Sequence, residues 1–171
     1  GDGVTIRPYD QIIKYLNDLS ADTRLLIDES TINIQLYNAV KNARIINGEL
    51  ISRHQKAIKN ETELLLFEHA MVKDGVALTH AFYWLENTLK ERAVSEFEFA
   101  NKLAACRSQQ ADYYGESFAA IIGYKGNGAI IHYRPMEDSC DHIRNEGILL
   151  ADSGGQYFDG TTDITRTISF S

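Results

Sequence analysis

The sequence predicts an α+β fold in which two long helices pack on a mostly antiparallel sheet. Two helix-like stretches occupy residues 61–110, and short strand candidates separated by turns follow from residue 118 onward. A β-α-β pattern precedes both helices and indicates the end of a smaller α/β domain. We therefore expect a domain boundary between residues 1–49 and residues 50–171.

Composition excludes several classes of function. The 171 residues are 44% hydrophobic and 24% charged, which is enough apolar material for a buried core. A net charge of −7 argues against binding to nucleic acid or to an anionic membrane surface, and no apolar run reaches the length of a membrane span. Cys106 and Cys140 form no CxxC or zinc-type spacing. We expect two reduced thiols in a cytoplasmic protein.

The first fifty residues contain short elements. Apolar residues at helical spacing predict a helix over residues 8–16, and a buried-strand candidate follows at residues 24–28. Residues 28–31 are candidates to cap a helix that ends near Val40. A second strand is expected at residues 43–46, before an Asn-Gly turn.

The longest predicted helix covers residues 61–88. Residues 51–58 before it are typical of a linker. Asn60 is a good N-cap, and Glu63 stands at the capping-box position three residues later. Gly75 is an interior weak point that costs about 1 kcal/mol relative to Ala, and it suggests close packing at that position.

A second helix is expected from Ser95 to about Gln110, with Ser95 as its cap and Glu98 at the capping-box position. After it the pattern changes to short apolar runs between glycines and polar turns. The strand candidates are residues 118–122, 129–133, 147–152 and 162–168.

Two aspartates stand out, one in each of the last two of these strands. Asp152 interrupts an apolar run, and Asp163 immediately precedes Ile164. A buried carboxylate is costly unless it is paired or bound to a metal, and a shared cation relieves the repulsion of two neighbouring carboxylates. Oxygen ligands alone suit hard cations such as Mn²⁺, Mg²⁺ or Ca²⁺. On the pattern alone, we favour turn or cap positions for the two aspartates, with Arg166 as a salt-bridge partner.

The length of the intervening loop decides whether the two carboxylates can meet. A two-residue Asp-Gly loop would set Asp163 opposite Gln156, too far along the strand. A four-residue loop at residues 157–160 would set Asp163 opposite Gly154. Asp152 is then its diagonal neighbour on the same face, at roughly 7–8 Å between Cα atoms. We prefer the wider loop.

The run from Asp152 to Thr167, with its Asp-Gly-Thr-Thr-Asp segment, resembles the first metal-binding segment of the Xaa-Pro aminopeptidases in the pita-bread metallopeptidase family. The run 128–133, Gly-Ala-Ile-Ile-His-Tyr, is similar to the histidine strand of that family, and residues 59–63 resemble the start of its catalytic domain. The resemblance implies the first half of a pita-bread domain over residues 50–171, after the end of a creatinase-like domain.

This resemblance implies roles for individual residues. Asp152 and Asp163 would be ligands of two divalent metal ions, usually Mn²⁺, with Zn²⁺ or Co²⁺ as alternatives, and Asp163 would bridge them. His132 would line the substrate site and hydrogen-bond the substrate or reaction intermediate, although a histidine on an apolar strand is more often a core residue. Thr165 and Arg166 would orient the Asp163 carboxylate without binding the metal ions themselves.

The family completes its metal cluster with one His and two Glu from a later half of the domain, and we expect this chain to lack them. The resemblance implies that the parent protein releases the N-terminal residue of peptides with proline in second position, as a cytoplasmic homodimer. We expect the chain alone to be inactive. A prolidase-like dipeptidase and a non-catalytic pita-bread module that binds peptides or proteins remain alternatives.

Overall fold

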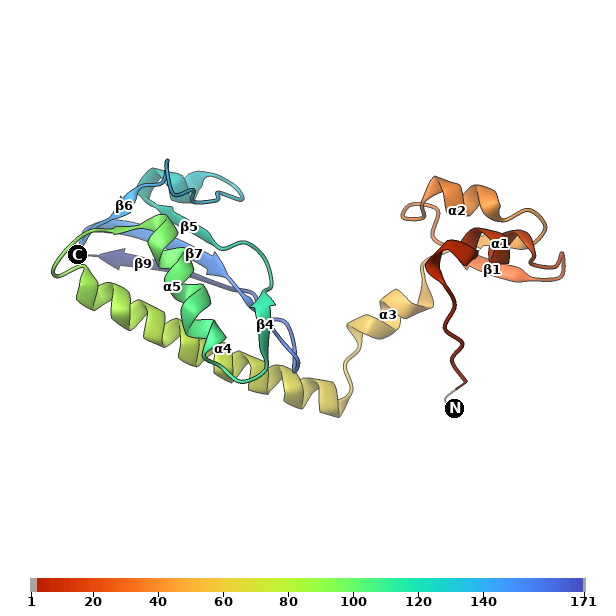
Figure 1. Cartoon of the computed structure of the whole chain (residues 1–171), viewed down its shortest axis with the longest axis horizontal. Coiled ribbons are helices and arrows are strands. Elements are labelled where there is room, and N and C mark those ends of the chain that lie inside the picture. The colour runs from red at the N-terminus through yellow and green to blue at the C-terminus, as the bar shows by residue number, and fades with distance from the viewer. Residues whose placement is uncertain (1–2, 171) are drawn as a thin grey trace. The chain divides into compact units, whose positions relative to one another are not determined.

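A computed structural model describes residues 3–170 of the chain. The chain divides between Lys59 and Asn60 into two units (Figure 1). The boundary expected after residue 49 lies earlier in the chain than this division. A short helix, α3 (Ile51–Ala57), occupies the stretch that was predicted to be a linker. Arg53 of α3 lies 3.8 Å from the carboxylate of Asp28, which gives the helix a contact within the first unit.

The first unit is a small parallel β-α-β arrangement. The predicted cap at residues 28–31 is wrong. Asp28 Oδ1 instead accepts hydrogen bonds from the backbone amide and hydroxyl of Ser30. The residue that caps the following helix, α2 (Ile34–Ala39), is Asn33, whose side chain accepts from the Gln35 amide. The elements of this unit before α3 are η1 (Tyr9–Gln11), α1 (Ile12–Asn17), β1 (Arg24–Ile27), α2 (Ile34–Ala39) and β2 (Arg44–Asn47), and β1 pairs with β2 in parallel.

The second unit begins with the long helix α4 (Glu61–Thr88). Its predicted capping box is confirmed, because the Asn60 side chain accepts from the Glu63 amide and the Glu63 carboxylate accepts from the Asn60 amide. The close packing expected at Gly75 is wrong. A Cβ at that position would meet nothing within 4 Å, so the glycine only weakens the helix.

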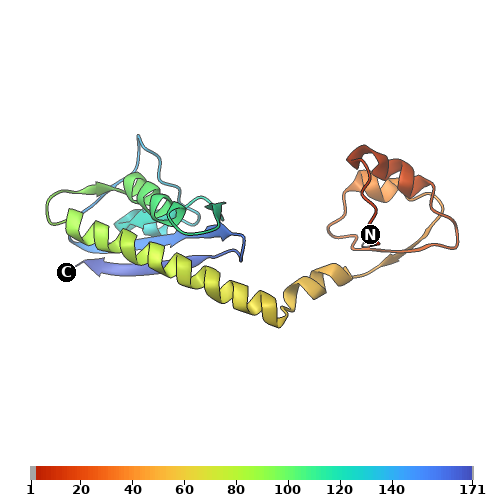
Figure 2. The same cartoon turned by 60° about the horizontal axis from the view of Figure 1, so that its bottom comes forward.

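Helix α5 (Glu96–Ser108) follows a two-residue strand, β3 (Val94–Ser95). Ser95 caps α5 by accepting from the Glu98 amide at 3.0 Å. The Glu98 carboxylate does not complete a capping box, because both of its oxygens accept hydrogen bonds from Arg92. Figure 2 shows α4 and α5 lying along the same side of the sheet.

The described strands of the second unit form three small sheets, and every strand pair in them is antiparallel. β5 (Ile121–Tyr124), β7 (Gly147–Ser153) and β9 (Ile164–Phe170) form three strands with β7 in the middle. β4 (Tyr113–Glu116) pairs with β8 (Gly155–Tyr157), and β3 pairs with β6 (His142–Ile143). One hydrophobic cluster joins α4 and α5 to β3, β5, β6, β7 and β9, which confirms the predicted α+β architecture.

Residues 129–133 do not form the predicted strand. A 3-10 helix, η2 (Lys125–Ala129), and a turn occupy this region, and His132 has a left-handed φ of 57°. A Cβ on Gly123 would lie 2.7 Å from the backbone of Gly128, so the chain folds back tightly against the preceding strand. Ile131 therefore points to solvent with 85% of its surface exposed.

Candidate metal and catalytic site

Strand pairing places the two aspartates of the sequence prediction on one face of a hairpin. Asp152 of β7 lies opposite Thr165 of β9, and the chain between β7 and β9 keeps the same register as far as Gln156 and Thr161. Asp163 therefore lies across from Gly154 and diagonal to Asp152, which is the register that the wider loop predicts. Two backbone hydrogen bonds between Tyr157 and Gly160 close the turn itself.

Gly154 makes this close pairing possible. A Cβ at Gly154 would lie 1.9 Å from the Thr162 carbonyl oxygen and 2.3 Å from Ser117 Oγ. Ser117 links the two segments, since its amide donates to the Gly154 carbonyl and its hydroxyl donates to the Thr162 carbonyl. A side chain at Gly154 would push apart the strands that bring Asp163 next to Asp152.

The two carboxylates are more accessible than the sequence suggests. Asp152 is half-buried and accepts a hydrogen bond of 2.9 Å from Thr165 Oγ1, whereas Asp163 is exposed. Thr165 therefore contacts Asp152 rather than Asp163. Arg166 donates to the Thr165 carbonyl oxygen at 2.8 Å. Burial alone therefore does not require a cation next to these two carboxylates.

The donor chemistry nevertheless fits a hard divalent cation. Two carboxylates on one face supply oxygen ligands, and one of them is oriented by a hydroxyl. No group of three His, Cys, Asp or Glu side chains within residues 3–170 is arranged to hold a metal ion. Asp152 and Asp163 can therefore be part of a ligand set, and a tight site needs further ligands.

His132, the third predicted site residue, lies in the turn after η2 and is exposed. Within the described part of the chain it has no hydrogen bond to either aspartate. Its neighbour Tyr133 is anchored, since its hydroxyl donates to Glu96 Oε2 at 2.7 Å. Burial, and then this hydrogen bond, raise the pKa of Tyr133 well above its usual range, so the hydroxyl remains a donor.

Three buried ionic side chains of the second unit were not predicted from the sequence. Glu96 is fully buried at the start of α5, where an acidic residue is expected to be exposed and to complement the helix dipole. Asp74 and Arg107 are also fully buried and form a bidentate pair at 2.7 and 3.0 Å. The only sequence signal for this pair is the position of Asp74 on the apolar face of its helix.

The Asp74–Arg107 pair also contacts β8, the strand that leads into the hairpin turn. Tyr157 of β8 donates to Asp74 Oδ1 at 2.9 Å, and Lys73 pairs with Asp159 in the turn at 2.8 Å. Burial, followed by the Asp74 carboxylate, raises the pKa of the Tyr157 hydroxyl. Helix α4 therefore contacts the turn that precedes Asp163.

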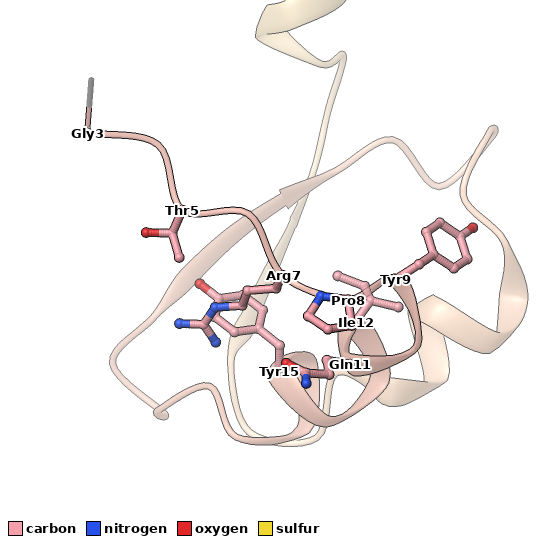
Figure 3. Close-up of a pocket in the computed structure, with 8 residues that line it drawn as sticks. All are labelled: Gly3, Thr5, Arg7, Pro8, Tyr9, Gln11, Ile12 and Tyr15. Carbon is pink, nitrogen blue, oxygen red and sulfur yellow. The ribbon is translucent and has the colours of Figure 1, made fainter. Parts of the chain in front are cut away.

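A separate pocket of about 610 Å³ lies in the first unit. Its one charged lining side chain is Arg7, whose guanidinium lies 5.2 Å from the centre of the Tyr15 ring (Figure 3). This lining contains no acid-base pair, and we assign no chemistry to it. No described helix has the length and apolar character that crossing a bilayer would require.

Comparisons with known proteins match both units. The model of metallopeptidase family M24 matches residues 66–171, and the creatinase/prolidase N-terminal domain matches residues 1–63. Aminopeptidase P2 of Arabidopsis thaliana is 35% identical over 99% of this chain and 28% of its own length. The chain thus spans little more than a quarter of this relative.

Two solved structures have the same fold. X-prolyl aminopeptidase from Caenorhabditis elegans, a cytosolic enzyme with a di-nuclear active site, has a TM-score of 0.87 and 27% identity over 98% of this chain and 29% of its own. Prolidase from Pyrococcus furiosus has a TM-score of 0.71 and 22% identity over 98% of this chain and 47% of its own, a likeness of fold alone.

Proposed function

Because the chain belongs to metallopeptidase family M24, we propose that it is part of an Xaa-Pro aminopeptidase, which releases the N-terminal residue that precedes proline in a peptide. One observation carries this proposal. The hairpin register brings Asp152 and Asp163 to the same face, with Thr165 orienting Asp152. The likeness to aminopeptidase P2 over nearly the whole chain supports the choice of substrate.

Asp152 and Asp163 would hold part of a cluster of two divalent ions, for which we propose Mn²⁺. When bound, such a cluster supplies a water nucleophile at neutral pH and polarises the scissile carbonyl. The Thr165 hydroxyl occupies Asp152 Oδ1 and fixes the carboxylate in orientation. His132, on an exposed turn, would donate a hydrogen bond to the substrate.

The remaining ligands would come from the part of the protein that this chain does not span. The chain covers 28% of aminopeptidase P2, and its two carboxylates do not complete a site within the described residues. We therefore propose that the chain alone is inactive. A cytosolic location is supported by the Caenorhabditis elegans enzyme. A homodimer of the full-length protein belongs to the same proposal.

The test uses the full-length protein after removal of metal and reloading with Mn²⁺. Ala-Pro-Ala and Ala-Pro are offered as separate substrates, and release of alanine is measured. We expect hydrolysis of the tripeptide only, and no hydrolysis after chelation. Cleavage of the dipeptide alone would favour a prolidase, whose fold the chain shares. Cleavage of neither by the metal-loaded protein would contradict the proposal and favour a binding module.

A further inference from the structure

Glu96 is a fully buried carboxylate that the proposed reaction does not use. Four groups donate hydrogen bonds to its carboxylate. Its oxygens accept from the Tyr124 amide at 2.6 Å, from Asn127 Nδ2 at 3.1 Å, from the Tyr133 hydroxyl at 2.7 Å and from the Asp141 amide at 2.9 Å. A carboxylate that accepts from so many donors is strongly oriented.

All of these donors belong to one segment, residues 124–141, which connects β5 to β6. Tyr124 is the last residue of β5, and Asp141 immediately precedes β6. Tyr133 directly follows His132. One carboxylate therefore holds the beginning and the end of the segment, together with the residue next to the predicted catalytic histidine.

The backbone of His132 gives a second, independent indication. Its φ of 57° lies in the left-handed region, which a residue other than glycine adopts at a cost. Such a conformation persists only where the surroundings determine it. Since His132 itself has no hydrogen bond among the described residues, the constraint must come from its anchored neighbours.

We propose that Glu96 is a positioning residue, which fixes the place of His132 by holding the segment 124–141. This inference rests on the proposed role of His132 in the peptidase reaction. A buried ion pair or carboxylate is seldom an efficient source of stability, but a fully satisfied one specifies a single arrangement of the chain around it. Glu96 meets this description for the His132 turn.

The first test is Glu96→Gln in the metal-loaded full-length protein. The glutamine keeps the shape, but its amide nitrogen would face donors instead of accepting from them. We expect kcat to fall about 100-fold, because a small displacement of a catalytic group has an effect of this size. KM should change less than about twofold, and the metal content should remain that of the wild type.

A double-mutant cycle separates positioning from general damage to the fold. If Glu96 acts through His132, Glu96→Gln should cost almost nothing further in a His132→Ala background. An undiminished loss of kcat in that background would overturn the inference, as would a Glu96→Gln single variant with wild-type kcat. If His132→Ala itself keeps wild-type kcat, the proposed role of His132 fails, and the inference fails with it.

Two further variants complete the design. Glu98→Gln is the control. Glu98 lies in the same first turn of α5 as Glu96, but its carboxylate pairs with the exposed Arg92, so this variant should keep wild-type kcat. Tyr133→Phe removes a single donor to Glu96 and retains the ring. Should Glu96→Gln fail to fold, Tyr133→Phe carries the test. Its kcat should fall, with the loss absent in the His132→Ala background, and unchanged kcat would overturn the inference.

Discussion

Asp163 faces the same way as Asp152 because Gly154 has no side chain. The backbone of Thr162 and the hydroxyl of Ser117 occupy the volume that a Cβ would need, and the closest approach would be 1.9 Å to a carbonyl oxygen. Neither neighbour can move away easily. One is the backbone of Thr162, and the other, Ser117 Oγ, is held by the hydrogen bond that it donates to the Thr162 carbonyl oxygen. The geometry of the candidate site therefore depends on this glycine.

Replacing Gly154 by alanine should destabilise the second unit by about 1–3 kcal/mol, as overpacking does in a tight interior. Gly75→Ala is the matched control. Its Cβ would meet nothing within 4 Å in the middle of α4, so it should stabilise the chain by about 0.8–1 kcal/mol. Urea unfolding of both variants measures the difference. A Gly154→Ala chain as stable as the wild type would show that the hairpin relaxes without cost.

At the scale of elements, a buried ionic network joins α4, α5 and β8. Asp74 lies on α4, Arg107 on α5 and Tyr157 on β8, and their polar atoms meet at 2.7–3.0 Å. Arg107 Nη1 has no partner among the described residues, so the guanidinium depends heavily on the single carboxylate. This network fixes how the strand before Asp163 sits against the helices.

Asp74→Asn should therefore cost about 3–5 kcal/mol of unfolding free energy, because it leaves a buried guanidinium without its counter-charge. Tyr157→Phe removes one hydrogen bond to a charged group and should cost about 1.5–3 kcal/mol. Glu146→Gln is the control, since Glu146 pairs with Lys125 at the surface and should change stability by less than about 1 kcal/mol. Denaturant unfolding gives all of these values, and equal effects of Asp74→Asn and Glu146→Gln would contradict the account.

The first turn of α5 gives a prediction of pH dependence. Hydrogen bonds from Arg92 hold the pKa of Glu98 below its ordinary value of 4.5. The stability from this pair is therefore present above the ordinary pKa and is lost as the pH falls through the lowered one. Glu98→Gln should lose less stability than the wild type between about pH 5 and pH 3. Unfolding measured at both pH values checks this, and identical losses would refute it.

At the scale of the whole molecule, the sequence predicts those features that local chemistry decides. The capping residues and apolar periodicity define α4 completely. The hairpin register follows because, of the two-residue and four-residue loops, only the longer one brings Asp152 and Asp163 together. The turn that carries His132 could not be predicted, since its shape depends on Glu96 far earlier in the chain. The pairing of Asp74 with Arg107 is equally non-local, and periodicity does not reveal it.

In the proposed enzyme, this chain would supply two carboxylates to a metal site that needs further ligands. The described residues contain no group of three potential ligands, and the chain spans 28% of aminopeptidase P2. We therefore expect Asp152 and Asp163 to become metal ligands in the full-length protein.

The number of metal ions bound per chain tests this expectation. Full-length wild type, Asp152→Asn, Asp163→Asn and Asp138→Asn are dialysed against the same Mn²⁺ buffer, and the ions bound per chain are counted by elemental analysis. Asp138 is an exposed aspartate and serves as the control. We expect two ions in the wild type and in Asp138→Asn, and fewer in each of the other variants. Two ions retained in both Asp152→Asn and Asp163→Asn would contradict the account.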